Sequence, residues 1–252
     1  MFTAFRMLFK GALRDRVSLL WAIAFPVIFL VVLGFIFPTP AYRQQLLAGM
    51  LALSVLFFGL HGIAFESLYQ RNSGVYKLLR ATPYRVITFV INLTLARGLV
   101  ALLSGAIVAI VGMLIFNVWF RWESVLLLLP MLVLATLCFT FLGLTVSNLA
   151  QNETQVSMIN NVVTLPMMFA SEVFYSLSAA PAWVRVVGHV FPLSYLVEGE
   201  KAALLVNASG VVSPTMILLG FTLLALTLAV VTFRWDPDAP PMRRVLRVRT
   251  AS

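Results

Sequence analysis

The sequence predicts an all-α polytopic membrane protein with six transmembrane helices, and three observations support that fold class. Of its 252 residues, 61% are hydrophobic and only 11% are charged, whereas soluble domains are about half apolar and a quarter charged. Apolar runs long enough to cross a bilayer recur along most of the chain. Basic residues collect between these runs mainly on one side, as in cytoplasmic loops. The net charge of +9 is therefore explained by membrane topology and does not indicate nucleic-acid binding.

The N-terminal segment is predicted to be an interfacial helix that precedes the first span. Basic side chains recur every four residues and apolar side chains line another face, namely Arg6, Lys10 and Arg14 against Phe2, Phe5, Phe9 and Leu13. Such a helix lies in the inner membrane interface, either as a plain anchor or as a surface that also touches a cytoplasmic partner. The apolar run that follows is longer than the core of a signal peptide and lacks a cleavage motif, so it is predicted to be retained.

Six spans follow from the apolar runs: residues 17–37, 46–65, 98–120, 125–146, 154–170 and 215–233. Pro26 lies inside the first, where neighbouring helices can satisfy the freed carbonyl, and Pro214 is expected to start the sixth. Trp119 and Trp122 bracket the end of the third, as in an interfacial aromatic belt. Residues 1–235 are predicted to form one transmembrane domain, followed by a basic cytoplasmic tail at 236–252.

The orientation follows from the 18 Lys and Arg residues. Thirteen fall before the first span, in 66–85 or in the C-terminal tail, and only four fall on the other side. Both termini are therefore predicted to be cytoplasmic. Arg97 is the remaining one, just before the uncharged part of the third span. We favour a side chain that extends to the inner headgroups; if the crossing instead begins at Val86, Arg97 is buried and a functional role becomes more plausible.

The polar stretch at 66–85 has the pattern of a short docking helix. It reads ESLYQRNSGVYKLLRATPYR, with a partly apolar face and with Arg71 among its basic residues. It resembles the cytoplasmic coupling segment of type-2 ABC exporter permeases through Glu66, Gly74, Leu78, Leu79, Thr82 and Pro83.

A second resemblance to that family lies in residues 172–201. The matching residues are Pro181, Trp183, Phe191, Pro192 and Tyr195. In the family this segment forms short re-entrant helices at the outer leaflet, so the resemblance implies a re-entrant outer hairpin and gate between helices five and six. The 41 residues from Glu172 to Val212 are too apolar to lie in water and too interrupted to span the membrane, which fits that arrangement. With its six spans in the same order, the resemblance to the family covers nearly the whole chain.

The energy source is expected to lie outside this chain. The sequence has no G-x-x-x-x-G-K-[ST] motif for binding nucleotide, and the six predicted spans contain no Asp or Glu of the kind that proton-driven carriers use. The resemblance implies a separate ATPase, in two copies, that docks on 66–85 and holds ATP and Mg. It also implies a second copy of this chain, a multi-pass position in the plasma (inner) membrane, and a transport subunit that is not itself an enzyme and binds no cofactor.

The sequence gives little information about the transported molecule. Apolar, aromatic spans and short outer loops favour a lipophilic drug, an antibiotic or a lipid-like molecule; a lipid-linked glycan or polysaccharide is the alternative, and a passive channel or carrier is less favoured. An intramembrane enzyme would need a motif such as H-E-x-x-H, which is absent.

Two sets of polar residues have open roles. Those on the fifth span either form hydrogen bonds between helices or line a pathway: Ser157, Asn160, Asn161 and Thr164. The outer ionisable residues are either solvated or part of a polar gate: Glu172, His189, Glu198 and Glu200.

Overall fold

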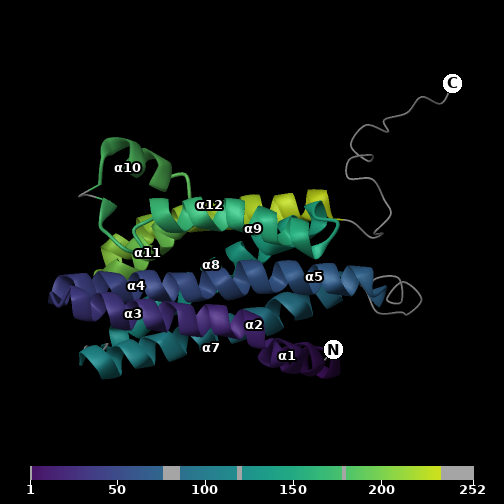
Figure 1. The fold of residues 1–252 in the computed structure, drawn as a ribbon, viewed down its shortest axis with the longest axis horizontal. Coiled ribbons are helices and arrows are strands. Elements are labelled where there is room, and N and C mark those ends of the chain that lie inside the picture. Colours follow the sequence, from purple (N-terminus) through teal and green to yellow (C-terminus); the bar gives the residue numbers. More distant parts are fainter. Residues whose placement is uncertain (1, 76–85, 118–120, 178–179, 234–252) are drawn as a thin grey trace.

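The computed structural model describes residues 2–75, 86–117, 121–177 and 180–233, and all regular structure in these ranges is helical. The long helices run side by side along the long axis of the molecule (Figure 1). Five segments are long and apolar enough to cross a membrane: Arg16–Ile36, Pro40–Asn72, Ile91–Phe116, Trp122–Leu149 and Ala208–Thr232. The predicted fifth span forms a further helix, α9 (Glu153–Ala170), whose first half is too polar for it to join the five.

The first crossing segment changes its helical pitch near Pro26. It consists of α2 (Arg16–Leu19), a π-helical turn η1 (Leu20–Ala24) and α3 (Phe25–Ile36). Proline has no N–H to donate to the preceding turn, and inserted π turns are a common way in which a helix absorbs such a break. The proline therefore lies inside the span, as the sequence predicts.

The second crossing segment forms the centre of the molecule. It runs without a break through α4 (Pro40–Leu56), a second π-helical turn η2 (Phe57–Gly62) and α5 (Ile63–Asn72). In its most apolar stretch of 18 residues, 94% of the residues are buried, against 39% or less in the corresponding stretches of the other four segments. A helix that is apolar on all sides is stable when neighbours surround it, and α3, α7, α8 and α11 all pack against it.

The remaining long helices differ from their predicted starts. The third, α7 (Val86–Phe116), begins 12 residues before the uncharged run at 98–120. The fourth, α8 (Trp122–Leu149), packs extensively along α12 (Ala208–Thr232). We predicted that Pro214 starts the last helix, but Pro214 lies inside it. The helix begins earlier because the side chain of Asn207 caps it, accepting a hydrogen bond from the Gly210 N–H at 3.1 Å.

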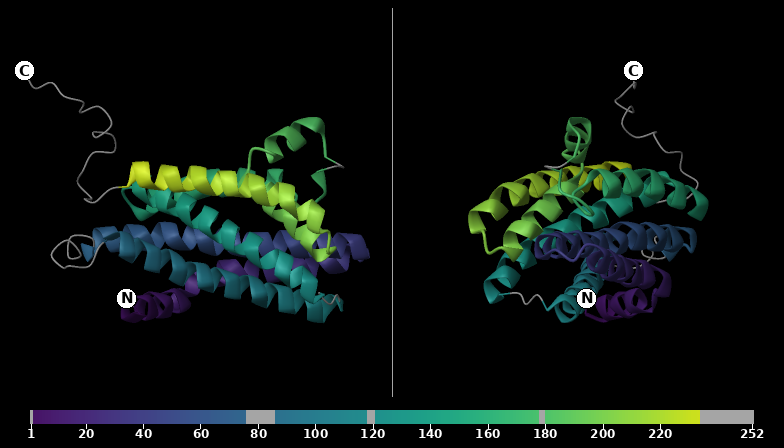
Figure 2. Two further views of the ribbon diagram at one scale, coloured as in Figure 1. Left: turned by 180° about the vertical axis from the view of Figure 1, so that it is seen from behind. Right: turned by 60° about the vertical axis from the view of Figure 1, so that its left-hand side comes forward.

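Short helices occupy both ends of the bundle. The N-terminal helix α1 (Phe2–Arg14) packs on α7, at the end where α5 finishes (Figures 1 and 2). At the opposite end, α10 (Ala182–Gly188) and α11 (Pro192–Leu204) lie between α9 and α12 in the sequence. The sequence predicts two short helices here, and neither is long enough to cross a bilayer alone.

Several predicted features lie outside the described residues. These are the tail at 236–252, together with Leu78, Leu79, Thr82, Pro83 and Trp119.

Candidate functional site

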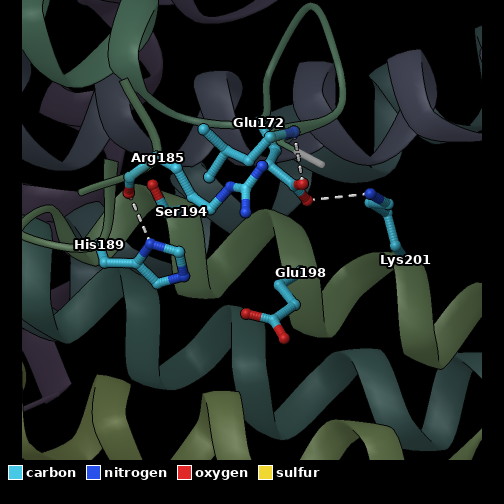
Figure 3. A pocket seen from close by; sticks show the side chains of 7 residues that line it. Glu172, Arg185, His189, Ser194, Glu198 and Lys201 are labelled. Carbon is cyan, nitrogen blue, oxygen red and sulfur yellow. Dashed lines mark hydrogen bonds and ion pairs between the residues drawn. The ribbon is translucent and has the colours of Figure 1, made fainter. Parts of the chain in front are cut away.

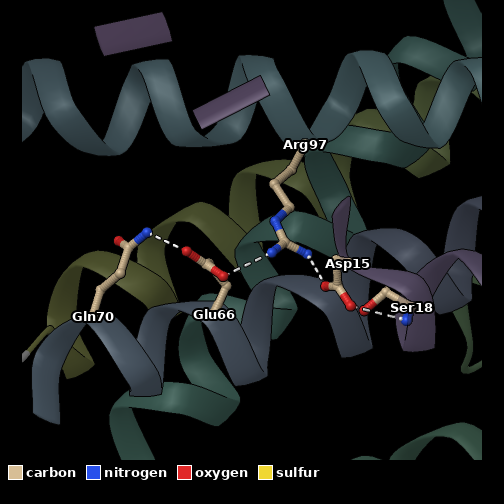
Figure 4. Close-up of polar contacts among 5 residues, drawn as sticks. All are labelled: Asp15, Ser18, Glu66, Gln70 and Arg97. Atoms are coloured by element: carbon tan, nitrogen blue, oxygen red, sulfur yellow. Dashed lines mark hydrogen bonds and ion pairs between the residues drawn. The ribbon is translucent and has the colours of Figure 1, made fainter. Parts of the chain in front are cut away.

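The strongest polar contacts at the α1 end of the bundle converge on Arg97 of α7 (Figure 4). Its side chain is 2% exposed. Its Nη1 donates to Asp15 Oδ2 at 2.9 Å, and its Nη2 donates to Glu66 Oε2, also at 2.9 Å. Asp15 lies between α1 and α2, whereas Glu66 lies on α5. One guanidinium therefore joins three segments that are far apart in the sequence.

Each carboxylate has a second partner that fixes its direction. Asp15 Oδ1 caps α2 by accepting from the Ser18 N–H at 3.1 Å, and Glu66 Oε1 accepts from Gln70 Nε2 at 2.6 Å. Burial raises the pKa of Asp15, but the hydrogen bonds from Ser18 and the charge of Arg97 outweigh this and hold it below its usual value. Asp15 therefore stays ionised when it faces the arginine.

The preferred sequence interpretation of Arg97 was wrong. We expected a side chain that reaches the inner headgroups, but α7 already begins at Val86, so Arg97 lies 11 residues inside a helix and is buried by its neighbours. The missed signal is the combination of Asp15 and Glu66, each just outside a predicted span. Two carboxylates at the inner ends of neighbouring spans can compensate a buried arginine.

The predicted coupling segment is described only in its first part. Glu66 joins the Arg97 cluster, and Arg71 is buried, with its guanidinium donating to the carbonyl oxygens of Ser147 and Ala150 at the end of α8. Gly74 has a φ of 77°, a left-handed conformation that favours glycine. Glycine at this position therefore allows the chain to turn directly after α5.

The polar residues of α9 divide into two pairs. Asn160 and Thr164 are buried against the rest of the chain, whereas Ser157 and Asn161 are exposed. Among the described residues, the Asn160 amide and the Thr164 hydroxyl have no hydrogen-bond partner. The helix therefore presents polar groups both inward and outward, and the four residues do not form a single lining.

At the opposite end, ionisable side chains surround a hollow of about 390 Å³ (Figure 3). Glu172 follows α9 and accepts from Lys201 of α11 at 2.9 Å. Its other oxygen accepts from the Leu177 N–H at 2.8 Å. Arg185, His189 and Glu198 complete the lining with Ser194. The paired charges join the connection after α9 to the last turn of α11.

The predicted outer-gate residues shape the two short helices. Pro181 caps α10 and Pro192 occupies the first turn of α11, where a missing N–H costs little. Trp183 is 71% exposed. The Tyr195 hydroxyl donates to the His189 carbonyl at 3.0 Å, and half-buried Phe191 caps α11 and packs at the edge of the apolar core. Four of the five thus fix the turns of this segment, whereas Trp183 points away from it.

Glu200 differs from the other outer carboxylates. It is 0% exposed, on the face of α11 that packs into the core. Neither carboxylate oxygen has a hydrogen-bond partner among the described residues, and burial raises the pKa of Glu200 well above its usual value. The sequence left solvated and gate roles open, and the structure places Glu198 at the surface and Glu200 inside. Within the described ranges, no group of His, Cys, Asp and Glu side chains is arranged to hold a metal ion.

Comparison with known proteins points to one family. Residues 1–205 match the family described as ABC-2 type transporter. The chain is 25% identical over 164 residues to the inner membrane transport permease YadH of Escherichia coli, an alignment that covers 64% of this chain and 62% of that permease. It is 23% identical over 204 residues to the putative transport permease ycf38 of Porphyra purpurea, covering 77% of this chain and 70% of the relative. The match thus spans less than two thirds of the length of YadH.

Proposed function

The chain belongs to the ABC-2 type transporter family, and from that premise we propose that it is the membrane-spanning subunit of an ATP-driven exporter. A partner ATPase, in two copies, supplies ATP hydrolysis, and two copies of this chain enclose the pathway. The observation that carries the proposal is the family match over 1–205, which includes the docking-like segment after α5 and the outer helices. The permease names of the relatives support the same class of protein.

We place α1 and the end of α5 on the cytoplasmic side. The distribution of basic residues supports this orientation, because thirteen of the 18 Lys and Arg residues fall before the first span, in 66–85 or in the C-terminal tail. In this arrangement α9 is a sixth crossing, and α10 with α11 forms a re-entrant hairpin in the outer leaflet. Ser157 and Asn161, which are exposed on α9, then lie towards the second copy and the pathway.

The proposed cargo is lipophilic, either a drug, an antibiotic or a lipid-like molecule. The exposed surfaces of α7 and α12 are dominated by large apolar side chains, which suit a cargo that enters from the bilayer. The connection between α3 and α4 is short, so it forms no external domain for capturing a large polar cargo. A lipid-linked glycan remains the second candidate because its lipid part would meet the same surfaces.

The decisive experiment is copurification followed by reconstitution. The chain is expressed with the ATPase encoded next to it, and the purified complex is placed in proteoliposomes loaded with candidate cargo. We expect ATP hydrolysis and ATP-dependent movement of cargo away from the ATPase side. Gly74→Pro is the matched variant, because proline cannot adopt the positive φ at this turn, and it should lower transport while the chain stays in the membrane. A chain that moves cargo equally well without the ATPase would instead be a passive carrier.

Orientation is tested separately by labelling with an impermeant thiol reagent. Cysteines replacing Thr39 and Glu123, which lie at one end of the bundle, should react from outside intact cells, and a cysteine replacing Ser73 should not. The only native cysteine, Cys138, is buried and gives little background. Reaction at Ser73 alone would invert the topology and remove the argument for ATPase docking.

A further inference from the structure

Arg97 connects the N-terminal helix to the helix that leads into the docking segment. We propose that it is a positioning residue: it clamps α1 to the end of α5, so that both move as one body when the ATPase acts. The movement rests on the proposed function, whereas the clamp itself rests on the geometry alone. Its components are Asp15 at the α1–α2 junction and Glu66 on α5, one on each arm of the guanidinium (Figure 4).

The clamp matters because the two helices meet otherwise only at a small apolar cluster of the described residues, which includes Ile63 of α5 and has Leu8 of α1 packed against it. Helix α1 packs on α7, while α5 packs on α8, α9 and η2. Between the described parts of α1 and α5 there is no extensive direct packing. Polar contacts through α7 add a second link, because Arg97 binds both Asp15, directly after α1, and Glu66 of α5.

The chemistry requires arginine rather than any cation. The planar guanidinium directs Nη1 and Nη2 to two separate acceptors at once, whereas the lysine ammonium is a single charged point. The surroundings also hold the guanidinium of Arg97, because its central carbon lies over the ring of Phe58, 5.6 Å from the ring centre. A Cβ on Gly62 would lie 2.8 Å from Arg97 Nη1. The site therefore fits a guanidinium that is held in one position.

The clamp lies beside the two π-helical turns. Turn η1 on the first crossing segment contacts η2 on the second, and α7 contacts both. Phe58 and Gly62, which lie next to the guanidinium, belong to η2. Because π turns interrupt the regular helical bonding and are frequent at functional sites, the two helices can bend here. The parts on the inner side of the turns, held together by Arg97, would then pivot against the rest of the bundle.

A distance measurement on the full chain in lipid nanodiscs tests the clamp without the ATPase. Cys138→Ala removes the buried native thiol, and spin labels are attached at Met7→Cys on α1 and Tyr69→Cys on α5, which are 70% and 65% exposed. We expect one narrow distance distribution with Arg97 intact. Arg97→Lys should broaden it because only one arm can be held. Asp15→Asn should broaden it as well, although asparagine still caps α2.

The control is Arg121→Gln, which removes an exposed ion pair with Glu123 at the other end of the bundle and should leave the distribution unchanged. Unchanged widths in both Arg97→Lys and Asp15→Asn would overturn the clamp and leave the proposed transport function intact. In the reconstituted complex, the same two variants should retain ATP hydrolysis and lose transport. Equal loss of both activities would mean that Arg97 is needed only for assembly.

Discussion

Arg71 of α5 donates a hydrogen bond to the carbonyl oxygen of Ala150, the residue that ends α8. A second donation, 2.9 Å long, goes to the carbonyl of Ser147. The last carbonyls of a helix have no partner inside it, and a positive charge is also favourable at that end. Arg71 was predicted to belong to a docking surface, but the structure buries it between two helices.

Arg71→Gln is therefore expected to destabilise the folded chain. The glutamine is too short to satisfy both carbonyls, and a lost hydrogen bond to a charged group costs about 1.5–3 kcal/mol. Thermal unfolding in detergent measures the effect, with Arg121→Gln as the control because Arg121 is exposed and its described ion pair is with Glu123, two residues away. If both variants unfold at the same temperature as the parent, the bonds from Arg71 to the end of α8 do not contribute to stability.

Gly143 allows α8 to lie against the π turn of the second crossing segment. A Cβ there would lie 2.5 Å from the carbonyl oxygen of Leu60, and backbone atoms cannot move aside as a flexible side chain can. Gly143→Ala should therefore destabilise the chain by about 1–3 kcal/mol, as overpacking does. Thermal unfolding again provides the measurement.

The matched control for Gly143 is Gly105 of α7, which is also buried in a helix. The nearest atom to a Cβ at Gly105 is a methyl carbon of Val55 at 3.9 Å, an ordinary contact. Gly105→Ala should be neutral or stabilising by up to about 1 kcal/mol, since alanine favours helix more than glycine does. An equal loss of stability in both variants would contradict the close approach at Gly143.

Much of this fold is readable from the sequence because a bilayer imposes strict lengths on apolar runs. The start of α12 was missed because the Asn207 cap places it before Pro214, whereas the start of α7 at Val86 was one of two alternatives that the sequence left open. The Arg97 cluster could not be predicted, because its members are separated by 31 or more positions in the sequence and only packing brings them together. The same holds for Glu200, since a shift of two positions from Glu198 along α11 decides between core and surface.

The buried carboxyl of Glu200 is expected to make the folded chain less stable as the pH rises. Its pKa in the folded chain is raised by burial, so the folded state keeps the proton while the unfolded state loses it above about pH 4.3. The free energy of unfolding therefore falls as the pH rises from that value towards the raised pKa. Glu200→Gln should remove this part of the pH dependence, and Glu200→Met should stabilise the chain by about 1–3 kcal/mol, because a buried group without a partner is replaced by an apolar one.

Thermal unfolding at mildly acidic and mildly alkaline pH tests the role of Glu200. Glu198→Gln is the control, because Glu198 lies two residues earlier on α11 and is exposed. This variant should leave the dependence of stability on pH close to that of the parent. An unchanged profile in Glu200→Gln would mean that the carboxyl is ionised and has a partner in the assembled transporter.

Trp183 and Tyr195 are expected to respond differently to the same truncation. Trp183 is 71% exposed on α10 and contributes little to the packing of a single chain. Tyr195 donates to the His189 carbonyl, and its ring centre lies 5.9 Å from that of Phe221 on α12. Tyr195→Ala should therefore lower thermal stability by about 2–4 kcal/mol, as the loss of a large ring does, and Trp183→Ala should not change it.

In proteoliposomes, however, an exposed aromatic ring on the outer hairpin would contact lipid or the second copy. Trp183→Ala should therefore change cargo leak and transport while the rate of ATP hydrolysis stays the same. Parent-like leak and transport in Trp183→Ala would show that α10 is not part of the outer gate.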